Sequence, residues 1–93
     1  IIVQRNDLPN CQSSVWFFNI LIKERREFYI GLLDNKNIES RPFFIPLSDM
    51  DLYKSYSFSN RISRKISKMG ISLPTSYLID DNTIYKIRDI LNS

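Results

Sequence analysis

The chain contains a single cysteine, Cys11, and no histidine. No disulfide can therefore form within it, and a structural zinc site, which takes four Cys or His ligands, cannot be assembled from this sequence. Catalysis that pairs a serine or cysteine nucleophile with a histidine is excluded within the chain for the same reason. We expect no metal and no cofactor, so a hydrophobic core has to hold the fold.

The composition is that of one small globular domain. The chain has 93 residues, of which 43% are hydrophobic and 25% are charged, so a folded domain with a small margin of stability is expected. No apolar run reaches the roughly 18 residues that a membrane span needs. The net charge of +3 is mild and does not favour a nucleic-acid partner by itself. The composition leaves the oligomeric state open.

The first third of the chain predicts a strand, a helix and a second strand. The β-branched run 1–3 is typical of a buried strand. Ser13 or Ser14 can cap a helix over 15–27, and the apolar first half of that helix is expected to be buried. The aromatic and aliphatic segment 28–33 predicts the second strand. A strand–helix–strand unit implies parallel strand pairing with a right-handed crossover.

The remaining strands are expected to be of other kinds. Segment 41–47 is broken by two prolines, which favours an edge strand or an extended loop. Two β-type runs, 76–79 and 84–87, flank a short acidic turn and predict a C-terminal hairpin. Combined with the parallel unit, this hairpin gives an α/β domain with a mixed sheet and helices on its faces.

A second helix is predicted after Ser59 or Asn60, either of which can cap it, and it is expected to end at Gly70. One side of this helix carries an apolar stripe of Ile62, Ile66 and Met69. Beside it runs a basic stripe of Arg61, Arg64, Lys65 and Lys68. Four cations on one helix face are typical of a solvated surface, and they are also able to contact the phosphates of nucleic acid. No aromatic interleaving or phosphate-binding loop favours the second interpretation.

Two segments of the chain resemble the thioredoxin-like superfamily. The run 1–3 followed by 9–14 (PNCQSS) is similar to the family's first strand and its Pro-x-Cys-x-x-Cys turn. Residues 73–80 (LPTSYLID) resemble the segment around the family's cis-proline. The long separation between Cys11 and Pro74 is closest to the redoxin branch, the TlpA-like thiol-disulfide proteins. Compared with that family, the first strand is clipped and the last helix is short, so one domain, 1–93, truncated at one or both ends is expected.

The resemblance implies a thioredoxin-like fold and a thiol-disulfide oxidoreductase. Cys11, at the start of a helix, would be the attacking thiolate, and Ser14 would donate a hydrogen bond to it. A cis Pro74, with Leu73 and Thr75 beside it, would position the substrate. Because Ser14 replaces the second cysteine, the thiol-disulfide cycle cannot close within the chain.

A protein of this kind would have reduced activity and would need a thiol-containing protein or a small-molecule thiol as its partner. The resemblance also favours a periplasmic or other extracytoplasmic location. The same residues allow a second interpretation, in which Cys11 is a lone structural cysteine and Ser14 is only a helix cap. Whether the chain is an enzyme is therefore left open.

Two other functions compete with the redox hypothesis. The first is a non-enzymatic module that keeps the fold and binds a peptide or protein partner along the Pro74 edge. The second is a small basic nucleic-acid-binding or toxin-type domain. The hypotheses differ most in the geometry around Pro74, because the redox hypothesis requires a cis peptide bond there, with the proline ring beside the Cys11 sulfur.

Overall fold

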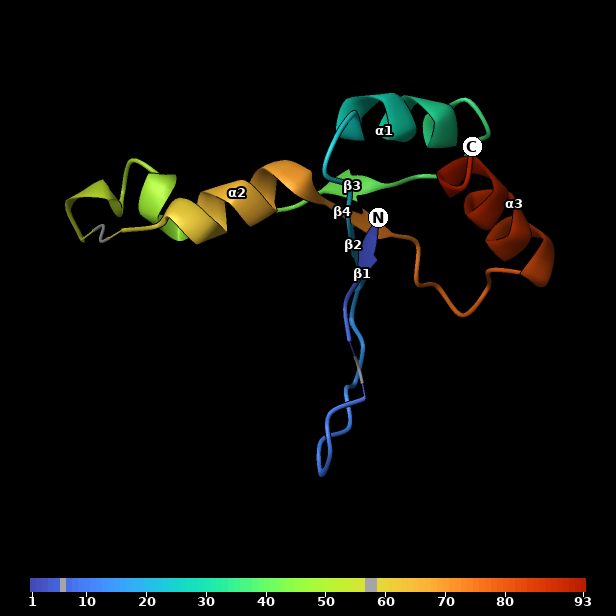
Figure 1. Cartoon of the computed structure of the whole chain (residues 1–93), viewed down its shortest axis with the longest axis horizontal. Helices are drawn as coiled ribbons and strands as arrows, with labels where there is room; N and C mark the ends of the chain where they lie inside the picture. The colour runs from blue at the N-terminus through green and yellow to red at the C-terminus, as the bar shows by residue number, and fades with distance from the viewer. Residues whose placement is uncertain (6, 57–58) are drawn as a thin grey trace.

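The structure is a computed structural model and describes residues 1–5, 7–56 and 59–93. In these residues the chain is an α/β domain, with a four-stranded antiparallel sheet and three helices (Figure 1). The sheet order is β1 (Ile2–Val3), β2 (Phe18–Leu21), β4 (Gly70–Leu73) and β3 (Arg41–Pro42). The helices are α1 (Arg26–Asp34), α2 (Arg61–Met69) and α3 (Asp81–Leu91), and two 3-10 turns, η1 (Leu47–Asp49) and η2 (Lys54–Tyr56), precede α2.

Every strand pairing in the described sheet is antiparallel, so the expected mixed sheet with a parallel strand–helix–strand unit is wrong. The helix predicted over 15–27 is also wrong, because this segment contains β2. Phe18 pairs with Leu73 and Ile20 pairs with Ile71, while Asn19 lies opposite Ser72. Successive side chains in a strand point to opposite faces, so an apolar–polar–apolar order suits a strand.

The second strand expected over 28–33 is helix α1 instead. Leu33 is fully buried, and Tyr29 and Ile30 pack against the core. These three positions fall on one side of a helix, at spacings of three and four residues, and a strand would have divided them between two faces. The edge strand predicted in 41–47 is confirmed by β3, and the strand in 1–3 is confirmed by β1, although β1 is exposed rather than buried.

The predicted C-terminal hairpin is wrong, because α3 occupies 81–91 and 76–79 is not a strand. Asp80, taken for a turn residue in the sequence, is the N-cap of α3, and its carboxylate accepts a hydrogen bond from the backbone N–H of Thr83 at 2.8 Å. This bond satisfies one of the unpaired N–H groups of the first helical turn. Ile87 then lies in the core, with Ile90 and Leu91 packed against it.

The cap predicts a dependence of stability on pH. The hydrogen bond from Thr83 holds the pKa of the Asp80 carboxyl below its ordinary value of 3.8. A carboxyl whose pKa is lower in the folded protein stabilises it above its unfolded pKa, and this contribution is lost as the pH falls below that value. Asp80→Ala is therefore expected to lower the melting temperature at neutral pH, and the difference from the unsubstituted protein should shrink between about pH 5 and about pH 2. A difference that stays constant over this range would contradict the assignment.

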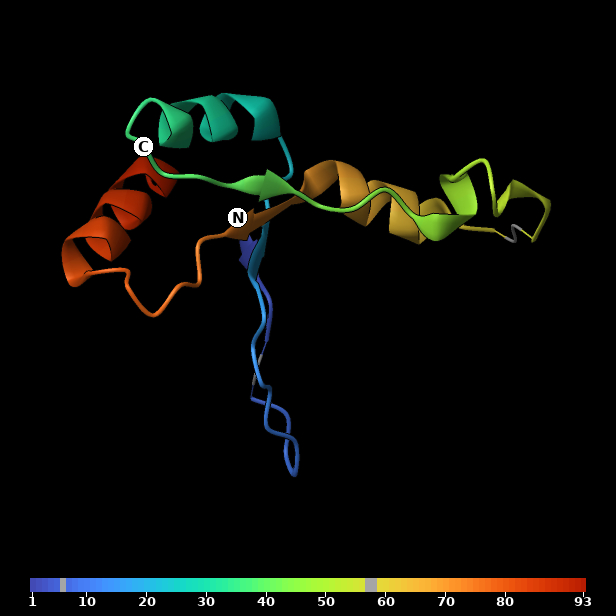
Figure 2. The ribbon, with the colours of Figure 1, turned by 180° about the vertical axis from the view of Figure 1, so that it is seen from behind.

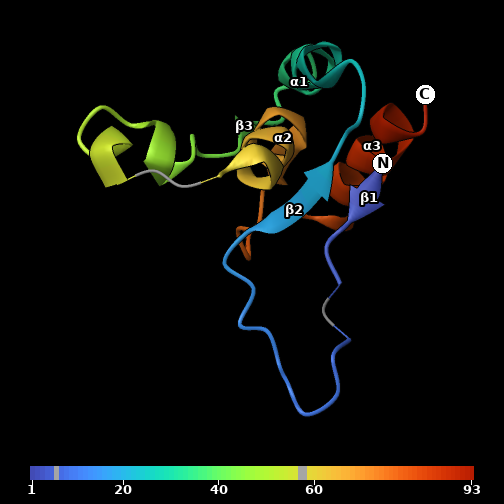
Figure 3. The same ribbon diagram turned by 60° about the vertical axis from the view of Figure 1, so that its left-hand side comes forward.

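The core is small and lies between one face of the sheet and helices α1 and α3, which sit next to each other (Figure 3). In the described part of the chain, the buried hydrophobic residues are Ile20, Ile22, Leu33, Ile38, Ile71, Leu73 and Ile87. Two of them, Leu33 and Ile71, have no exposed surface. The core therefore joins β2, β4, α1 and α3, and it leaves β1 and α2 outside.

Two arms extend from this body (Figures 1 and 2). The hairpin arm consists of the described residues of 4–17, between β1 and β2, and the α2 arm consists of the described residues of 47–69. The radius of gyration is 15.2 Å, whereas a compact domain of this length has about 12 Å. The described helices include none that is both long enough and apolar enough to cross a membrane. The molecule is therefore more extended than a compact domain of the same length, because two arms project from its core.

The α2 arm confirms the predicted second helix, which follows Asn60 and ends at Gly70. The Asn60 side chain does not cap the helix, and instead donates hydrogen bonds to Ser48 Oγ at 2.6 Å and Asp49 Oδ1 at 2.8 Å. Gly70 has an extended conformation, and a Cβ atom there would overlap the ring of Phe43. Gly70 therefore does not end the helix in a left-handed conformation. Its missing side chain instead lets the Phe43 ring pack close to the backbone.

Candidate functional site

Cys11 lies in the turn of the hairpin arm and is exposed. Its backbone N–H donates to the Leu8 carbonyl at 3.3 Å, and residues 11–15 form no helix. The expected position of Cys11 at a helix N-terminus is therefore wrong, and the helix dipole that would have favoured the thiolate is absent there. Ser14 caps no helix, and it is the neighbouring Ser13 whose Oγ accepts a hydrogen bond, from Val15 N at 3.2 Å.

Pro74 lies at the other end of that arm, beside the sheet. The described residues contain no cis peptide bond, so the expected cis Pro74 is wrong. Leu73 is buried and paired with Phe18, and Thr75 Oγ1 donates to the Trp16 carbonyl at 2.9 Å, which joins the segment to the base of the arm. Cys11 is in the turn of the arm, which extends away from the sheet (Figure 3), so the structure does not bring Cys11 and Pro74 together.

The three residues expected to position a substrate, Leu73, Pro74 and Thr75, meet instead in a large apolar groove. We call it the Pro74 groove and define it by Val3, Phe18, Leu73, Pro74, Ile84 and Leu91. Its volume is about 770 Å³. It lies on the core side of the sheet, between β1, the base of the hairpin arm and α3.

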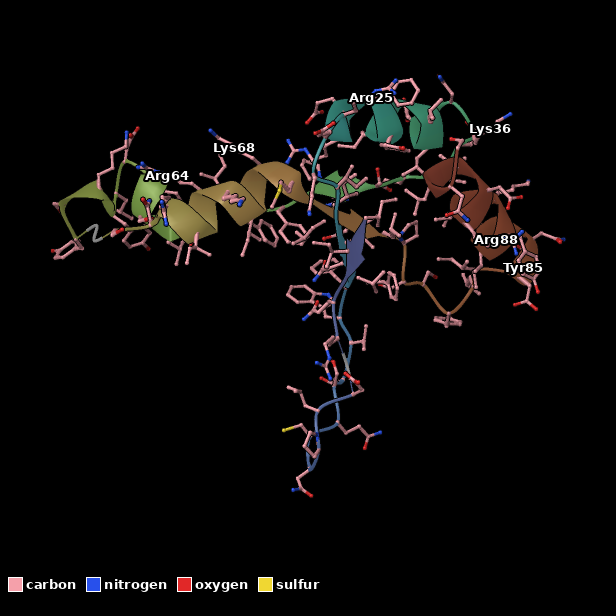
Figure 4. The ribbon with its side chains drawn as sticks, in the orientation of Figure 1. Arg25, Lys36, Arg64, Lys68, Tyr85 and Arg88 are labelled. Atoms are coloured by element: carbon pink, nitrogen blue, oxygen red, sulfur yellow. The ribbon has the colours of Figure 1, made fainter. Side chains whose placement is uncertain are left out.

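The groove is almost free of charge. Among the described residues that line it, Arg88 is the one charged side chain, and its guanidinium donates to the Asp89 carboxylate at 2.7 and 3.0 Å. The Arg88 guanidinium carbon also lies 5.2 Å from the centre of the Tyr85 ring, and Figure 4 shows both side chains on α3. A groove of this composition favours an apolar, uncharged ligand segment.

The two edges of the sheet differ in what they offer a partner. At one edge, β3 contains Pro42, which has no backbone N–H and cannot complete a ladder. At the other edge, β1 pairs with β2 on one side, and no strand of the described chain pairs with its outer side (Figure 3). The Pro74 groove opens beside this free edge, because Val3 of β1 is one of its walls.

The basic residues of α2 form a second candidate site. Arg64 donates two hydrogen bonds through Nε and one through Nη2 to the Asp49 carboxylate, at 2.6 to 2.9 Å. These bonds hold the pKa of Asp49 below its ordinary value. The other three cations, Arg61, Lys65 and Lys68, are exposed and contribute to an open hollow of about 600 Å³. The expected apolar stripe beside them is not buried, since α2 contains no buried residue.

A third hollow, of about 420 Å³, lies between α2 and the sheet face away from the core. Its walls include Phe17, Phe43 and Ile66, and Asn19 and Ser72 form a polar floor in which the Ser72 hydroxyl donates to Asn19 Oδ1 at 2.9 Å. None of the site residues expected from the sequence lines this hollow.

The sequence missed one wall of the Pro74 groove. Ile84, Ile87 and Leu91 of α3 line it, whereas the β-type pattern of 84–87 predicts a strand for the first two of them. Their spacing of three and four residues is a helical signal that could have found them. In the described part of the chain, no three acidic or cysteine side chains gather where they could hold a metal ion. Comparisons with protein-family models and with curated proteins found no match.

Proposed function

We propose that this chain is a non-enzymatic protein-binding module, and that the Pro74 groove receives an extended apolar segment of a partner protein. The observation that carries the proposal is the groove itself, which is large, apolar and open beside a free strand edge. The bound segment would pair its backbone with the outer side of β1, and its alternate side chains would enter the groove. Strand addition of this kind takes its affinity from main-chain hydrogen bonds and its specificity from side-chain pockets.

The amount of exposed surface supports a binding role. The accessible surface is 7820 Å², whereas a compact protein of 11.0 kDa exposes about 5,600 Å². The surplus of about 2,200 Å² is more than the roughly 800 Å² that each partner buries in a standard protein interface. Side chains that are normally core residues contribute to it, among them Trp16, Phe44 and Tyr77, which are each more than 75% exposed. A chain with this surface gains stability when it is covered by another protein.

Two features decide between the possible occupants of the groove. A charged ligand would lose its hydration without finding a free counter-charge, because Arg88 is already paired with Asp89. A small apolar molecule would fill the groove but form no hydrogen bonds with the exposed N–H and C=O groups of the β1 edge, which would stay bonded to water. An extended apolar peptide segment satisfies both features.

The thiol-disulfide hypothesis for Cys11 and Ser14 stays a prediction. It drew on a helix N-terminus at Cys11 and on a cis Pro74 next to the thiol, and neither supports it here. The protein-binding hypothesis uses the same Pro74, Leu73 and Thr75 in a different role, as the wall of a groove, and it assigns Cys11 no chemistry.

A selection from displayed short peptides tests the proposal. We expect the selected peptides to carry apolar residues at alternate positions, and to shift the backbone amide NMR signals of β1 and α3. Val3→Lys places a charge in the groove wall and is expected to weaken binding roughly tenfold or more, because the charge loses its hydration there. Ile84→Lys tests the opposite wall and leaves β1 intact.

The matched control is Leu52→Lys, which adds the same charge to the α2 arm at a side chain that is 76% exposed. This variant should bind the selected peptides as the unsubstituted protein does. Equal losses in Val3→Lys and Leu52→Lys would indicate general charge repulsion and contradict the groove as the binding site. Selected peptides without an alternating pattern would contradict strand addition.

A further inference from the structure

The hollow on α2 has a lining of one chemical kind. Its side chains all donate hydrogen bonds or carry positive charge, and they are Ser59, Asn60, Arg61, Arg64, Lys65 and Lys68. Among the residues that the structure describes, no carboxylate and no apolar side chain lines it. A partner that enters such a hollow meets the positively charged ends of long side chains, and it gains charge-assisted hydrogen bonds from them only if it is an anion.

The ion pair with Asp49 distinguishes Arg64 from the other three cations of the basic stripe. Arg64 is engaged by Asp49 in bonds of 2.6 to 2.9 Å, and Figure 4 shows Arg64 and Lys68 on the same side of α2. In the described part of the chain, no carboxylate pairs with Arg61, Lys65 or Lys68. These three cations fall at i, i+4 and i+7, so they follow one face of the helix at rises of about 6.0 and about 4.5 Å.

We propose that this row binds a run of neighbouring phosphate groups. Each phosphate carries negative charge and several acceptor oxygens, which suits both the guanidinium of Arg61 and the ammonium groups of Lys65 and Lys68. A row of cations at one-turn spacing meets successive phosphates of a linear ligand, whereas a single carboxylate would contact one cation at a time. Such ligands are inorganic polyphosphates and the backbone of single-stranded nucleic acid, which share this chemistry.

The site is separate from the Pro74 groove and goes beyond the proposed function. It lies on the α2 arm, which projects to one side of the sheet (Figures 1 and 2), while the groove lies between β1 and α3. Because none of the described lining residues belongs to both hollows, phosphate binding and peptide binding can each be lost without the other.

The experiment uses two probes, inorganic triphosphate and a short single-stranded DNA, titrated into the isotopically labelled protein. Both are expected to shift the amide signals of 59–68, and to bind more weakly as salt is added. For three phosphate contacts the logarithm of the DNA affinity should fall with a slope of about −2 against the logarithm of the salt concentration, which is roughly fifteenfold between about 50 and about 200 mM. Lys65→Gln should weaken binding and reduce the slope by about 0.7.

Lys36→Gln is the control, because it removes one charge from an exposed lysine far from α2 along the chain (Figure 4). Binding of triphosphate alone would assign the site to small polyphosphates, and binding of DNA alone would assign it to a nucleic-acid backbone; both results support the proposal. Binding of neither probe would overturn it. Equal losses in Lys36→Gln and Lys65→Gln would overturn it as well, because they would show attraction to the overall charge.

Discussion

Ile71→Ala is expected to lower the free energy of unfolding by about 2–5 kcal/mol, the largest effect of any single substitution considered for this chain. Ile71 has no exposed surface and pairs with Ile20 in the centre of the sheet. Truncation removes buried methyl and methylene groups and leaves a cavity that the surrounding residues fill only in part. Because few other described side chains are buried, the rest of the core cannot compensate for the lost contacts of Ile71. The loss is large beside a total stability of only about 5–15 kcal/mol, which is typical of natural proteins.

Urea unfolding of both proteins, followed by circular dichroism, measures the difference. Ile62→Ala is the control, because it makes the same chemical change on α2 at a side chain that is 69% exposed, and it should change stability by no more than about 0.5 kcal/mol. Similar losses in the two variants would show that Ile71 is not part of a packed core. If Ile71→Ala does not fold, Ile71→Val gives a graded version of the test, with an expected loss of about 0.5–1.5 kcal/mol.

Gly70→Ala is expected to cost about 1–3 kcal/mol, because the added methyl group would overlap the ring of Phe43. Gly70 ends α2 and begins β4, and the N–H of Phe43 donates to its carbonyl at 3.1 Å, so the two backbones are held close together. The overlap reaches Phe43 Cγ, which stays in place when the ring rotates about its Cβ–Cγ bond, so this rotation cannot relieve it.

The chain offers a matched glycine for comparison. Gly31 lies inside α1, and a Cβ atom there would meet nothing within 4 Å. Gly31→Ala should therefore stabilise the protein by about 0.5–1 kcal/mol, since alanine loses less backbone freedom in a helix. Thermal unfolding of both variants measures the change in stability, which should be a loss for Gly70→Ala and a gain for Gly31→Ala. A neutral Gly70→Ala, or a double variant with Phe43→Ala that recovers none of its loss, would contradict the close approach.

Local signals in the sequence predict some elements correctly and mislead on others. The α2 helix is predictable because its cap position, its periodic stripe and its terminal glycine all agree. The assignments of β2 and α1 are interchanged, because both segments are short apolar runs that suit either structure. Tertiary contacts decide between strand and helix for these segments. Ile20 pairs with Ile71 across the sheet, and Leu33 packs in the core.

Asp80 shows why the C-terminal part was misassigned. An Asp-Asp-Asn sequence between two apolar runs is a turn signal, but aspartate is also a preferred N-cap. The three-residue step to Thr83 and the helical spacing of Ile84, Ile87 and Leu91 favour the cap, and the structure has the helix. A strand over 84–87 would not place Ile84 and Ile87 on one face beside Pro74, whereas helix α3 makes them one wall of the groove.

The candidate site was predictable only in part for the same reason. Leu73, Pro74 and Thr75 are predicted as site residues only through the resemblance, and in the structure they line the groove. The groove itself could not be predicted, because its walls come from β1, β2, α3 and the segment after β4. Those walls meet only through the antiparallel sheet order, which the expected parallel unit excluded.

The unequal edges of the sheet also limit how large an assembly can become. A sheet with two open edges can accept a strand on each side, and copies can then add without end into a filament. Here Pro42 of β3 has no N–H to donate to a further strand, so among the strands that the structure describes β1 has the edge that accepts one. Once that single position is filled, propagation stops, and the stoichiometry of any complex formed through the sheet is fixed at one bound strand for each chain.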